Sequence, residues 1–282
     1  MRLSIITINY NNAEGLRNTL ASVAAQTYDD IEHIIVDAAS TDGSVDVIKE
    51  YAENAKHTVV WTSEKDKGIY DGMNRGVRKA AGDYVWILNS GDCAAASDTI
   101  ERIMRTLSDS HIDILLGNKI HVYPGDKKAC DPLPLMRIKD ETPRLMDVSM
   151  LTFYTGTIPQ DAAFVRRELF EKYGYFDEKM KICADWKLYL NMIALGGVLP
   201  NYVNIDVVLF DMTGISNMNN ELRLAERKAY LEEVLPASVR KDYDAYEFPI
   251  HQYRRLKKYH LWGLVYFMER VLFKLEKWHV LH

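Results

Sequence analysis

The stretch EKDKGIYDGMNRGVRKAAGDYVWILNSGD, residues 64–92, decides the fold. Residues 70–81 have helical spacing, and Tyr84–Leu88 is an uninterrupted apolar run of strand-forming residues. A strand without a polar face belongs inside a sheet that helices cover on both sides. The run stops at Asn89–Asp92, which predicts a turn that brings Asp92 to the carboxyl edge of the sheet, where open α/β sheets bind ligands. Taken alone, the same tetrapeptide is also typical of an ordinary surface turn.

The residues before this stretch repeat the alternation of strand and helix. Strands are predicted at residues 3–8, 32–36 and 58–62, and helices at residues 13–26 and 45–52. The short connections are typical of a parallel sheet. The second strand ends at another carboxylate, Asp37. The turn after the first strand has neither a GxGxxG nor a Walker motif, which disfavours a dinucleotide or P-loop protein.

The residues after Asp92 are less regular. Helices are predicted at residues 99–107 and 220–234, strands at residues 112–116 and 206–212, and a short strand followed by a helix at residues 158–167. Residues 119–157 are rich in proline and charged turns, which predicts a loop-rich insertion that shapes an acceptor pocket.

Composition limits the class of protein. The 282 residues, 48% of them hydrophobic, suffice for one large α/β domain with a small appendage. Three widely spaced cysteines argue against a disulfide framework, and the first apolar run is too short for a secretory signal, so a cytoplasmic protein is predicted. The net charge is −5, but residues 251–282 carry +5, which leaves −10 on the main body and disfavours nucleic-acid binding.

Four ordered segments resemble the nucleotide-sugar-binding half of family 2 glycosyltransferases. They are Thr7–Tyr10, DAASTDGS at residues 37–44, DKGIYDGMNRG at residues 66–76 and GDYVWILNSGD at residues 82–92. The DKGIYDGMN version is similar to that of bacterial transferases that build capsular, O-antigen or exopolysaccharide units. The resemblance implies the α/β GT-A fold: a mostly parallel central sheet flanked by helices, with a Rossmann-like nucleotide-binding half, an acceptor half and, here, a C-terminal helical extension.

The resemblance also implies the residues that bind the donor. The implied donor site consists of Thr7, Tyr10, Asp37, Asp71, Asn74 and Gly91. Within it, Thr7, Tyr10 and Asp37 would hold uridine, and the Asp37 carboxylate would accept a hydrogen bond from the uracil ring.

The resemblance places a metal at Asp92, the last position of the family's DxD motif, although Asn89 and Ser90 replace the earlier acidic positions. A hard divalent cation that bridges the phosphates through one carboxylate and several waters stabilises a departing diphosphate. Oxygen ligands imply Mg²⁺ or Mn²⁺, and the eight scattered histidines lack the spacing of a zinc site.

Residues 158–190 resemble the family's acceptor half. There, a carboxylate that begins a helix acts as the catalytic base, and this role carries over onto Asp185. Stabilisation of the helix by an acid in its first turn is the alternative, and both roles can hold together. The other acceptor-side and loop candidates are Gln160, Asp161, Trp186 and Ser216, the last in a segment similar to a loop that closes over the donor.

The prediction is therefore an inverting glycosyltransferase of surface polysaccharide synthesis that moves a sugar from a UDP-sugar to a saccharide hydroxyl, on a lipid-linked acceptor. Residues 1–235 are predicted to be the catalytic domain, with a donor half at 1–118 and an acceptor half at 119–235. Two alternatives stay open. One is a sugar-nucleotide-binding or scaffolding protein without turnover; the other is a sugar nucleotidyltransferase, which the missing Gly-rich phosphate loop disfavours.

Residues 236–282 are predicted to be a basic, amphipathic helical tail, too short and too charged to span a bilayer. Seven apolar residues gather on one helical face: Leu261, Leu264, Val265, Met268, Val271, Leu272 and Leu275. With Arg270, Lys274 and Lys277 lying away from that face, the pattern is typical of a helix on an anionic membrane, here the cytoplasmic face of the inner membrane. Packing against the catalytic domain or a second copy of the chain is the alternative.

Overall fold

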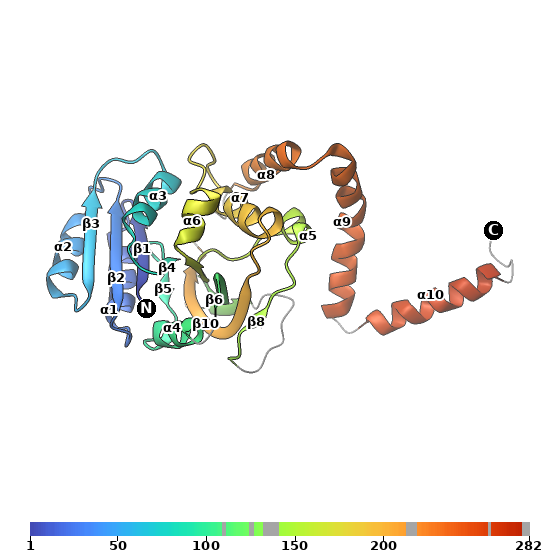
Figure 1. The fold of residues 1–282 in the computed structure, drawn as a ribbon, viewed down its shortest axis with the longest axis horizontal. Coiled ribbons are helices and arrows are strands. Elements are labelled where there is room, and N and C mark those ends of the chain that lie inside the picture. The colour runs from blue at the N-terminus through green and yellow to red at the C-terminus, as the bar shows by residue number, and fades with distance from the viewer. Residues whose placement is uncertain (109–110, 124–126, 132–140, 213–218, 259–260, 278–282) are drawn as a thin grey trace. The chain divides into compact units, whose positions relative to one another are not determined.

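The computed structural model describes residues 1–108, 111–123, 127–131, 141–212, 219–258 and 261–277 (Figure 1). The chain divides into two compact units, Met1–Lys228 and Ala229–His282. The first contains the motifs that resemble the glycosyltransferases, and the second contains the basic tail.

The first unit begins with the predicted alternation of strands and helices. Its elements are β1 (Leu3–Asn9), α1 (Ala13–Ala24), β2 (Ile31–Asp37), α2 (Ser44–Asn54), β3 (Thr58–Ser63), α3 (Ile69–Lys79) and β4 (Tyr84–Ile87). Helix α1 starts where the Asn12 side chain accepts the Gly15 N–H at 3.2 Å, an N-cap. Helix α3 ends at Lys79, two residues before its predicted limit, because Ala80 is already extended with ψ of 131°.

The elements after β4 include strands that the sequence pattern does not predict. They are β5 (Cys93–Ala94), α4 (Thr99–Ser108), β6 (Ile114–Tyr123), β7 (Lys127–Asp131), β8 (Arg144–Leu145), α5 (Met150–Thr155), β9 (Ala163–Arg166), α6 (Glu168–Tyr173), α7 (Ala184–Tyr189), the π-helix η1 (Leu190–Leu195), β10 (Asn201–Asp211) and α8 (Asn220–Val234). The predicted loop-rich region thus contains strands, because the later half of β6 pairs with both β7 and β10.

The strands form one sheet with the order β3-β2-β1-β4-β9-β6-β10-β5, and β7 pairs with β6 and β8 with β10 beside this path. The first four are parallel to one another, as are β6 and β10, while β9 runs antiparallel between β4 and β6. A largely parallel sheet flanked by helices is the predicted fold class. Its consequence for function is that β1, β2 and β4 end at the same edge.

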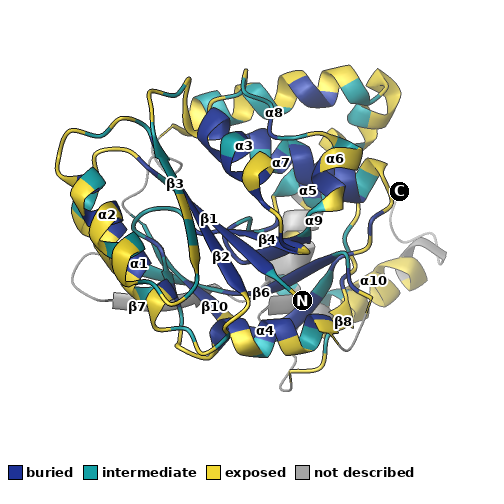
Figure 2. Cartoon of the chain, turned by 60° about the vertical axis from the view of Figure 1, so that its left-hand side comes forward, coloured by how far each residue is buried: buried dark blue, intermediate teal, exposed yellow. Residues whose placement is uncertain are grey.

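The core lies on both faces of this sheet (Figure 2). Helices α1 and α2 pack on one face around Ile35 of β2. Helix α3 packs on the other face at close range, because Gly76 has no Cβ; one would lie 2.4 Å from the Cγ2 atom of Ile6. Every residue of β4 is buried, and Trp86 is 0% exposed. The interior position predicted for Tyr84–Leu88 is therefore confirmed.

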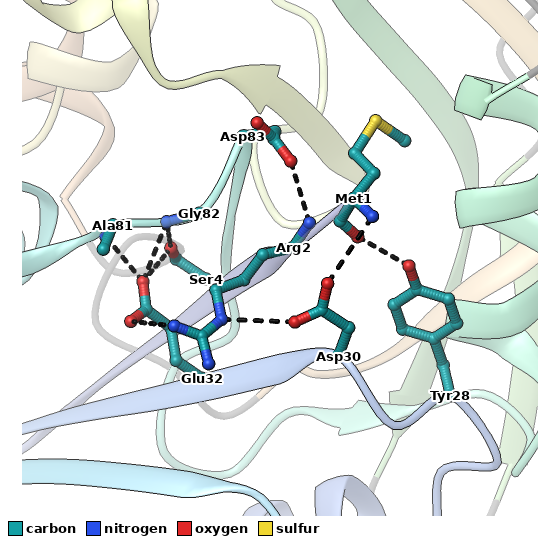
Figure 3. Close-up of polar contacts among 9 residues, drawn as sticks. All are labelled: Met1, Arg2, Ser4, Tyr28, Asp30, Glu32, Ala81, Gly82 and Asp83. Carbon is teal, nitrogen blue, oxygen red and sulfur yellow. Dashed lines mark hydrogen bonds and ion pairs between the residues drawn. The ribbon is translucent and has the colours of Figure 1, made fainter.

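A buried carboxylate, Glu32, organises the amino-terminal edge of the sheet (Figure 3). Its Oε1 atom accepts the backbone N–H groups of Ala81 at 2.6 Å and Gly82 at 3.0 Å, and the Ser4 hydroxyl at 2.5 Å. Arg2 lies 4.0 Å from the other carboxylate oxygen. These contacts fix the turn between α3 and β4, so the polar side chains at this edge serve the fold.

The second unit consists of the end of α8 followed by α9 (Ala237–Lys258) and α10 (Trp262–Lys277). Pro249 lies inside α9. Within the described ranges, no helix combines the length and the apolar character that crossing a membrane requires.

Candidate functional site

Three loops meet at the carboxyl edge of the parallel strands, those after β1, β2 and β4. The Asn12 side-chain amide donates to the Ser90 carbonyl at 3.2 Å, and the Asn11 N–H donates to the Ser40 hydroxyl at 2.8 Å. Asn11 and Ala39 have φ angles of 47° and 57°, in the left-handed region that residues other than glycine seldom adopt. Strained backbone of this kind gathers at functional sites, which marks this edge as the candidate site.

The Asp37 carboxylate is 0% exposed and is bound by several donors. Its Oδ1 accepts Asn9 Nδ2 at 2.8 Å and Ser40 Oγ at 2.5 Å, and its Oδ2 accepts the Ser40 N–H at 2.9 Å and Ser63 Oγ at 2.6 Å. Burial would raise the pKa of Asp37, but the hydrogen bonds from Ser40, Ser63 and Asn9 hold it below its ordinary value. The side chain thus ties β1, β2 and β3 together through these donors, and its role in binding uracil stays a prediction.

Asp37→Ala is expected to lower the free energy of unfolding by roughly 3 kcal/mol, because buried donors lose their acceptor. Denaturant unfolding measures this. Asp46→Ala is the matched control, since the Asp46 side chain is 86% exposed and only 3.6 Å from Lys49; it should change stability by less than about 0.5 kcal/mol. An Asp37 variant with normal stability and lost UDP affinity would instead support the predicted nucleobase role.

Thr7 and Tyr10 occupy opposite environments on β1 and the loop after it. The Thr7 hydroxyl is buried, donates to the Leu88 carbonyl at 2.8 Å and lies 2.9 Å from Nε2 of His33, whose pKa burial lowers to about 3. Tyr10 is 67% exposed, which leaves its ring free to stack on a nucleobase. Of the two residues, only Tyr10 is available to a ligand at this edge.

The two polar candidates on α3 are mostly engaged. The Asp71 Oδ2 atom accepts the Lys67 N–H at 3.0 Å and pairs with Arg75 at 2.9 Å. Asn74 is 1% exposed, and its amide donates to the Phe176 carbonyl and accepts the Phe176 N–H, each at 2.9 Å. Asn74 therefore joins α3 to the acceptor-side segment rather than facing the donor loops.

The turn at Asn89–Asp92 is held in place by Thr19 of α1. The Thr19 hydroxyl accepts the Gly91 N–H at 2.9 Å and donates to the Asp92 carbonyl at 2.7 Å. Gly91 has φ of 108°, which favours glycine, and a Cβ there would lie 3.5 Å from Asp211 Oδ2. Asp92 is 4% exposed, and its Oδ1 accepts the Asp211 N–H at 2.9 Å. The turn thus sets Asp92 against the end of β10.

Asp92 belongs to a group of carboxylates. Burial raises the pKa of Asp92 to about 8, and the charges of Asp161 and Asp211 add to this, while the Asp211 N–H and Lys119 oppose it. Lys119 Nζ pairs with Asp161 at 2.7 Å and lies 3.7 Å from the centre of the Phe210 ring.

The carboxylates near Asp92 suit a hard divalent cation, because such ions prefer oxygen ligands. Among the described residues no three His, Cys, Asp or Glu side chains form a ready metal group, so phosphate and water oxygens would complete its coordination.

Asp185 lies in the first turn of α7 and is partly buried. Its Oδ1 accepts a hydrogen bond from the Tyr70 hydroxyl at 3.2 Å. Burial raises the pKa of Asp185, the Trp186 N–H, Tyr70 and Arg227 lower it, and the charge of Asp161 raises it further. A carboxylate with a raised pKa is suited to general-base chemistry near neutral pH.

The remaining acceptor-side candidates differ in role. Asp161 is 6% exposed, and its charge raises the pKa of both Asp92 and Asp185. Gln160 is partly buried, with its amide 3.7 Å from Met73 Sδ. The Trp186 indole N–H donates to the Phe153 carbonyl at 2.9 Å, which makes Trp186 a packing residue under α7. Ser216 lies outside the described residues.

Three side chains at this edge were not predicted from the sequence: Tyr70, Lys119 and Asp211. Tyr70 has the spacing of an apolar helix position, and the pairing of β6 with β10 is needed to bring Lys119 and Asp211 to the site. The sequence pattern could have indicated Asp211, because Asp211 is the last residue of the largely apolar strand β10, as Asp37 is the last residue of β2.

Comparison with known proteins identifies relatives and similar folds. Residues 4–174 match the sequence profile described as Glycosyl transferase family 2. An uncharacterized glycosyltransferase of Mycobacterium tuberculosis is 31% identical over 221 residues, covering 76% of this chain and 77% of that protein. S. aureus TarS 1-349 in complex with UDP-GlcNAc superposes with a TM-score of 0.64 at 19% identity, over 91% of this chain and 73% of that one. Mannosyltransferase PcManGT from Pyrobaculum calidifontis, in complex with GDP-Man and Mn²⁺, gives a TM-score of 0.58 at 18% identity, over 88% and 69%. The two structures confirm the predicted fold class.

Proposed function

Because the chain belongs to glycosyl transferase family 2 and is a glycosyltransferase, we propose that it transfers a sugar from a UDP-sugar to a saccharide hydroxyl with inversion at the anomeric carbon. The observation that carries the proposal is the Asp185 carboxylate in the first turn of α7, which accepts a hydrogen bond from Tyr70 and whose pKa is raised by burial and by the charge of Asp161. A single base and a single displacement are sufficient for inversion.

In the proposed reaction, Asp185 takes the proton of the acceptor hydroxyl as the oxygen attacks the anomeric carbon. The new C–O bond forms on the face opposite the leaving group, and the bond to the diphosphate breaks with its electron pair. The acceptor must therefore lie beside α7, with the diphosphate toward the Asn89–Asp92 turn. The exposed ring of Tyr10 is the proposed stacking surface for the nucleobase.

Asp92 would hold a divalent cation, Mn²⁺ or Mg²⁺, together with the donor's phosphates. The fit rests on the raised pKa of Asp92, which burial and the neighbouring carboxylates produce and which a cation would reverse. When bound, such an ion supplies positive charge to the leaving diphosphate. The Mn²⁺ in the PcManGT complex supports divalent metal use on this fold.

The test is nucleotide release with and without saccharide acceptors, using UDP-GlcNAc, UDP-glucose, UDP-galactose and GDP-mannose with Mn²⁺. UDP release that requires an acceptor, and a product of inverted anomeric configuration by NMR, are expected. Release of GDP alone would move the proposal to another donor class. Binding without release would indicate a scaffolding protein, and formation of pyrophosphate would indicate a nucleotidyltransferase.

We assign a lipid-linked acceptor on the basis of α10, which exposes apolar side chains. Leu264 is 60% exposed, Phe267 65% and Met268 55%, and Arg270 and Lys274 are exposed on the same helix. An apolar surface combined with nearby cations favours an anionic lipid interface. The proposed enzyme would then act at the membrane surface in which its lipid-linked acceptor is anchored.

Leu264→Glu with Met268→Glu, in the full chain, is expected to reduce sedimentation with phosphatidylglycerol vesicles about tenfold or more. Wild-type binding should fall with salt and be weaker on phosphatidylcholine vesicles. Leu199→Glu is the control, since Leu199 is 57% exposed in the first unit. Equal sedimentation of variant and wild type, or a dimer that the variant converts to a monomer, would show that α10 contacts protein.

A further inference from the structure

The turn at residues 181–183, which leads into α7 and Asp185, is held from two separate helices. From α3, the Tyr70 hydroxyl shares its single proton between the Ile182 carbonyl at 2.6 Å and Asp185 Oδ1 at 3.2 Å. From α8, the Glu226 carboxylate accepts three successive backbone N–H groups, those of Lys181 at 2.6 Å, Ile182 at 3.1 Å and Cys183 at 3.0 Å. The segment that carries Asp185 is therefore fixed on both sides.

Tyr70 is well suited to act as a fixed donor. It is 6% exposed, and its ring stacks on Phe176 with the ring centres 5.8 Å apart. Burial and the nearby charge of Asp185 raise the pKa of Tyr70, so the hydroxyl keeps its proton throughout the working pH range. The hydroxyl joins residues 115 positions apart in the sequence, one from the donor half and one from the acceptor half.

We infer that Tyr70 is a positioning residue: its hydroxyl orients the Asp185 carboxylate, while Glu226 fixes the turn that carries Asp185. The inference rests on the proposed function, because the residue that Tyr70 positions is the proposed catalytic base. Neither Tyr70 nor Glu226 needs to touch substrate for this role.

Other groups around Asp185 act in different ways. Arg227 of α8 favours the charged carboxylate from a distance, and Asp161 opposes it. Tyr189, on the same helix as Asp185, is buried, and its pKa is raised by burial and by the charges of Asp185 and Asp161. The Trp186 N–H adds a backbone hydrogen bond. Replacing Tyr70 by phenylalanine therefore removes the hydrogen bond to Asp185 while the ring keeps its packing on Phe176.

Tyr70→Phe is expected to raise the pKa of Asp185 by about one pH unit, the equivalent of one hydrogen bond to a charged group. Carbon-13 NMR of the aspartate carboxyls, with Asp185→Asn used for assignment, measures this without turnover. The acid limb of the kcat profile should move upward by the same amount, with the KM for UDP-sugar unchanged. Tyr84→Phe is the control, since Tyr84 is also a buried tyrosine and donates to the Ile112 carbonyl; it should move neither value.

Glu226→Ala is expected to lower kcat about tenfold or more at an unchanged KM for donor, because three N–H groups lose their acceptor and Asp185 loses its fixed position. Glu226→Gln, which keeps one acceptor oxygen, should recover part of that loss. In an Asp185→Asn background, Tyr70→Phe should have no further effect on the rate, since both changes act through one carboxylate.

The inference is overturned if Tyr70→Phe leaves the carboxyl titration of Asp185 unchanged, or if its rate loss adds fully to that of Asp185→Asn. The proposed function fails differently. If Asp185 is not the base, the NMR titration still shifts in Tyr70→Phe, but the acid limb of the rate profile does not follow it.

Discussion

Asp185→Asn is expected to slow sugar transfer about a hundred- to ten-thousand-fold while UDP affinity stays near that of the wild type. The amide keeps the size of the side chain and can still accept from Tyr70, but it cannot take the acceptor's proton. Calorimetry with UDP and acceptor-dependent UDP release separate binding from chemistry. Wild-type activity should fall as the pH drops through the Asp185 pKa, which burial raises, because only the deprotonated carboxylate is a base.

Asp177→Asn is the matched control for that experiment. Asp177 pairs with Lys187 of α7 at 2.7 Å and is partly exposed, so its loss tests a nearby charge without touching Asp185. Activity within about twofold of wild type is expected, since this partly exposed ion pair does not involve Asp185. If Asp185→Asn kept more than about half of the activity, the base would lie elsewhere, and Asp161→Asn would be the next variant to measure.

Asp92→Asn is expected to lower activity about a hundredfold and to abolish the strengthening of UDP binding by Mn²⁺. The amide oxygen can still accept the Asp211 N–H, so the turn should keep its shape. What is lost is the negative charge that a cation requires. Calorimetry of UDP binding with and without Mn²⁺, for the variant and the wild type, measures the effect directly.

Asp98→Asn serves as the control for Asp92, because Asp98 is about half exposed and only 4.0 Å from Arg102. It should keep the full response to Mn²⁺. A full response in Asp92→Asn as well would show that nucleotide binding does not depend on metal. The replacement of the motif's earlier acids by Asn89 and Ser90 would then mark a metal-independent site.

Much of the fold could be predicted because strand and helix patterns are local. The alternation through β4 and the buried character of Tyr84–Leu88 follow from residue types and their spacing, and the structure confirms both. The strands after Ile114 were harder to predict. β6 continues to Tyr123 because β7 and β10 pair with it, and such pairing depends on residues far away in the chain.

The sequence by itself determined that carboxylates stand at strand ends, since Asp37 and Asp92 each follow an apolar run. Only the tertiary structure decided what surrounds each of them. Asp37 accepts hydrogen bonds from donors within the protein. Asp92 instead accepts the N–H of Asp211, 119 residues away in the sequence, and the charge of Asp161 raises its pKa. The physical reason is that hydrogen bonding and desolvation depend on neighbours in space, and the chain brings these together only when the sheet has formed.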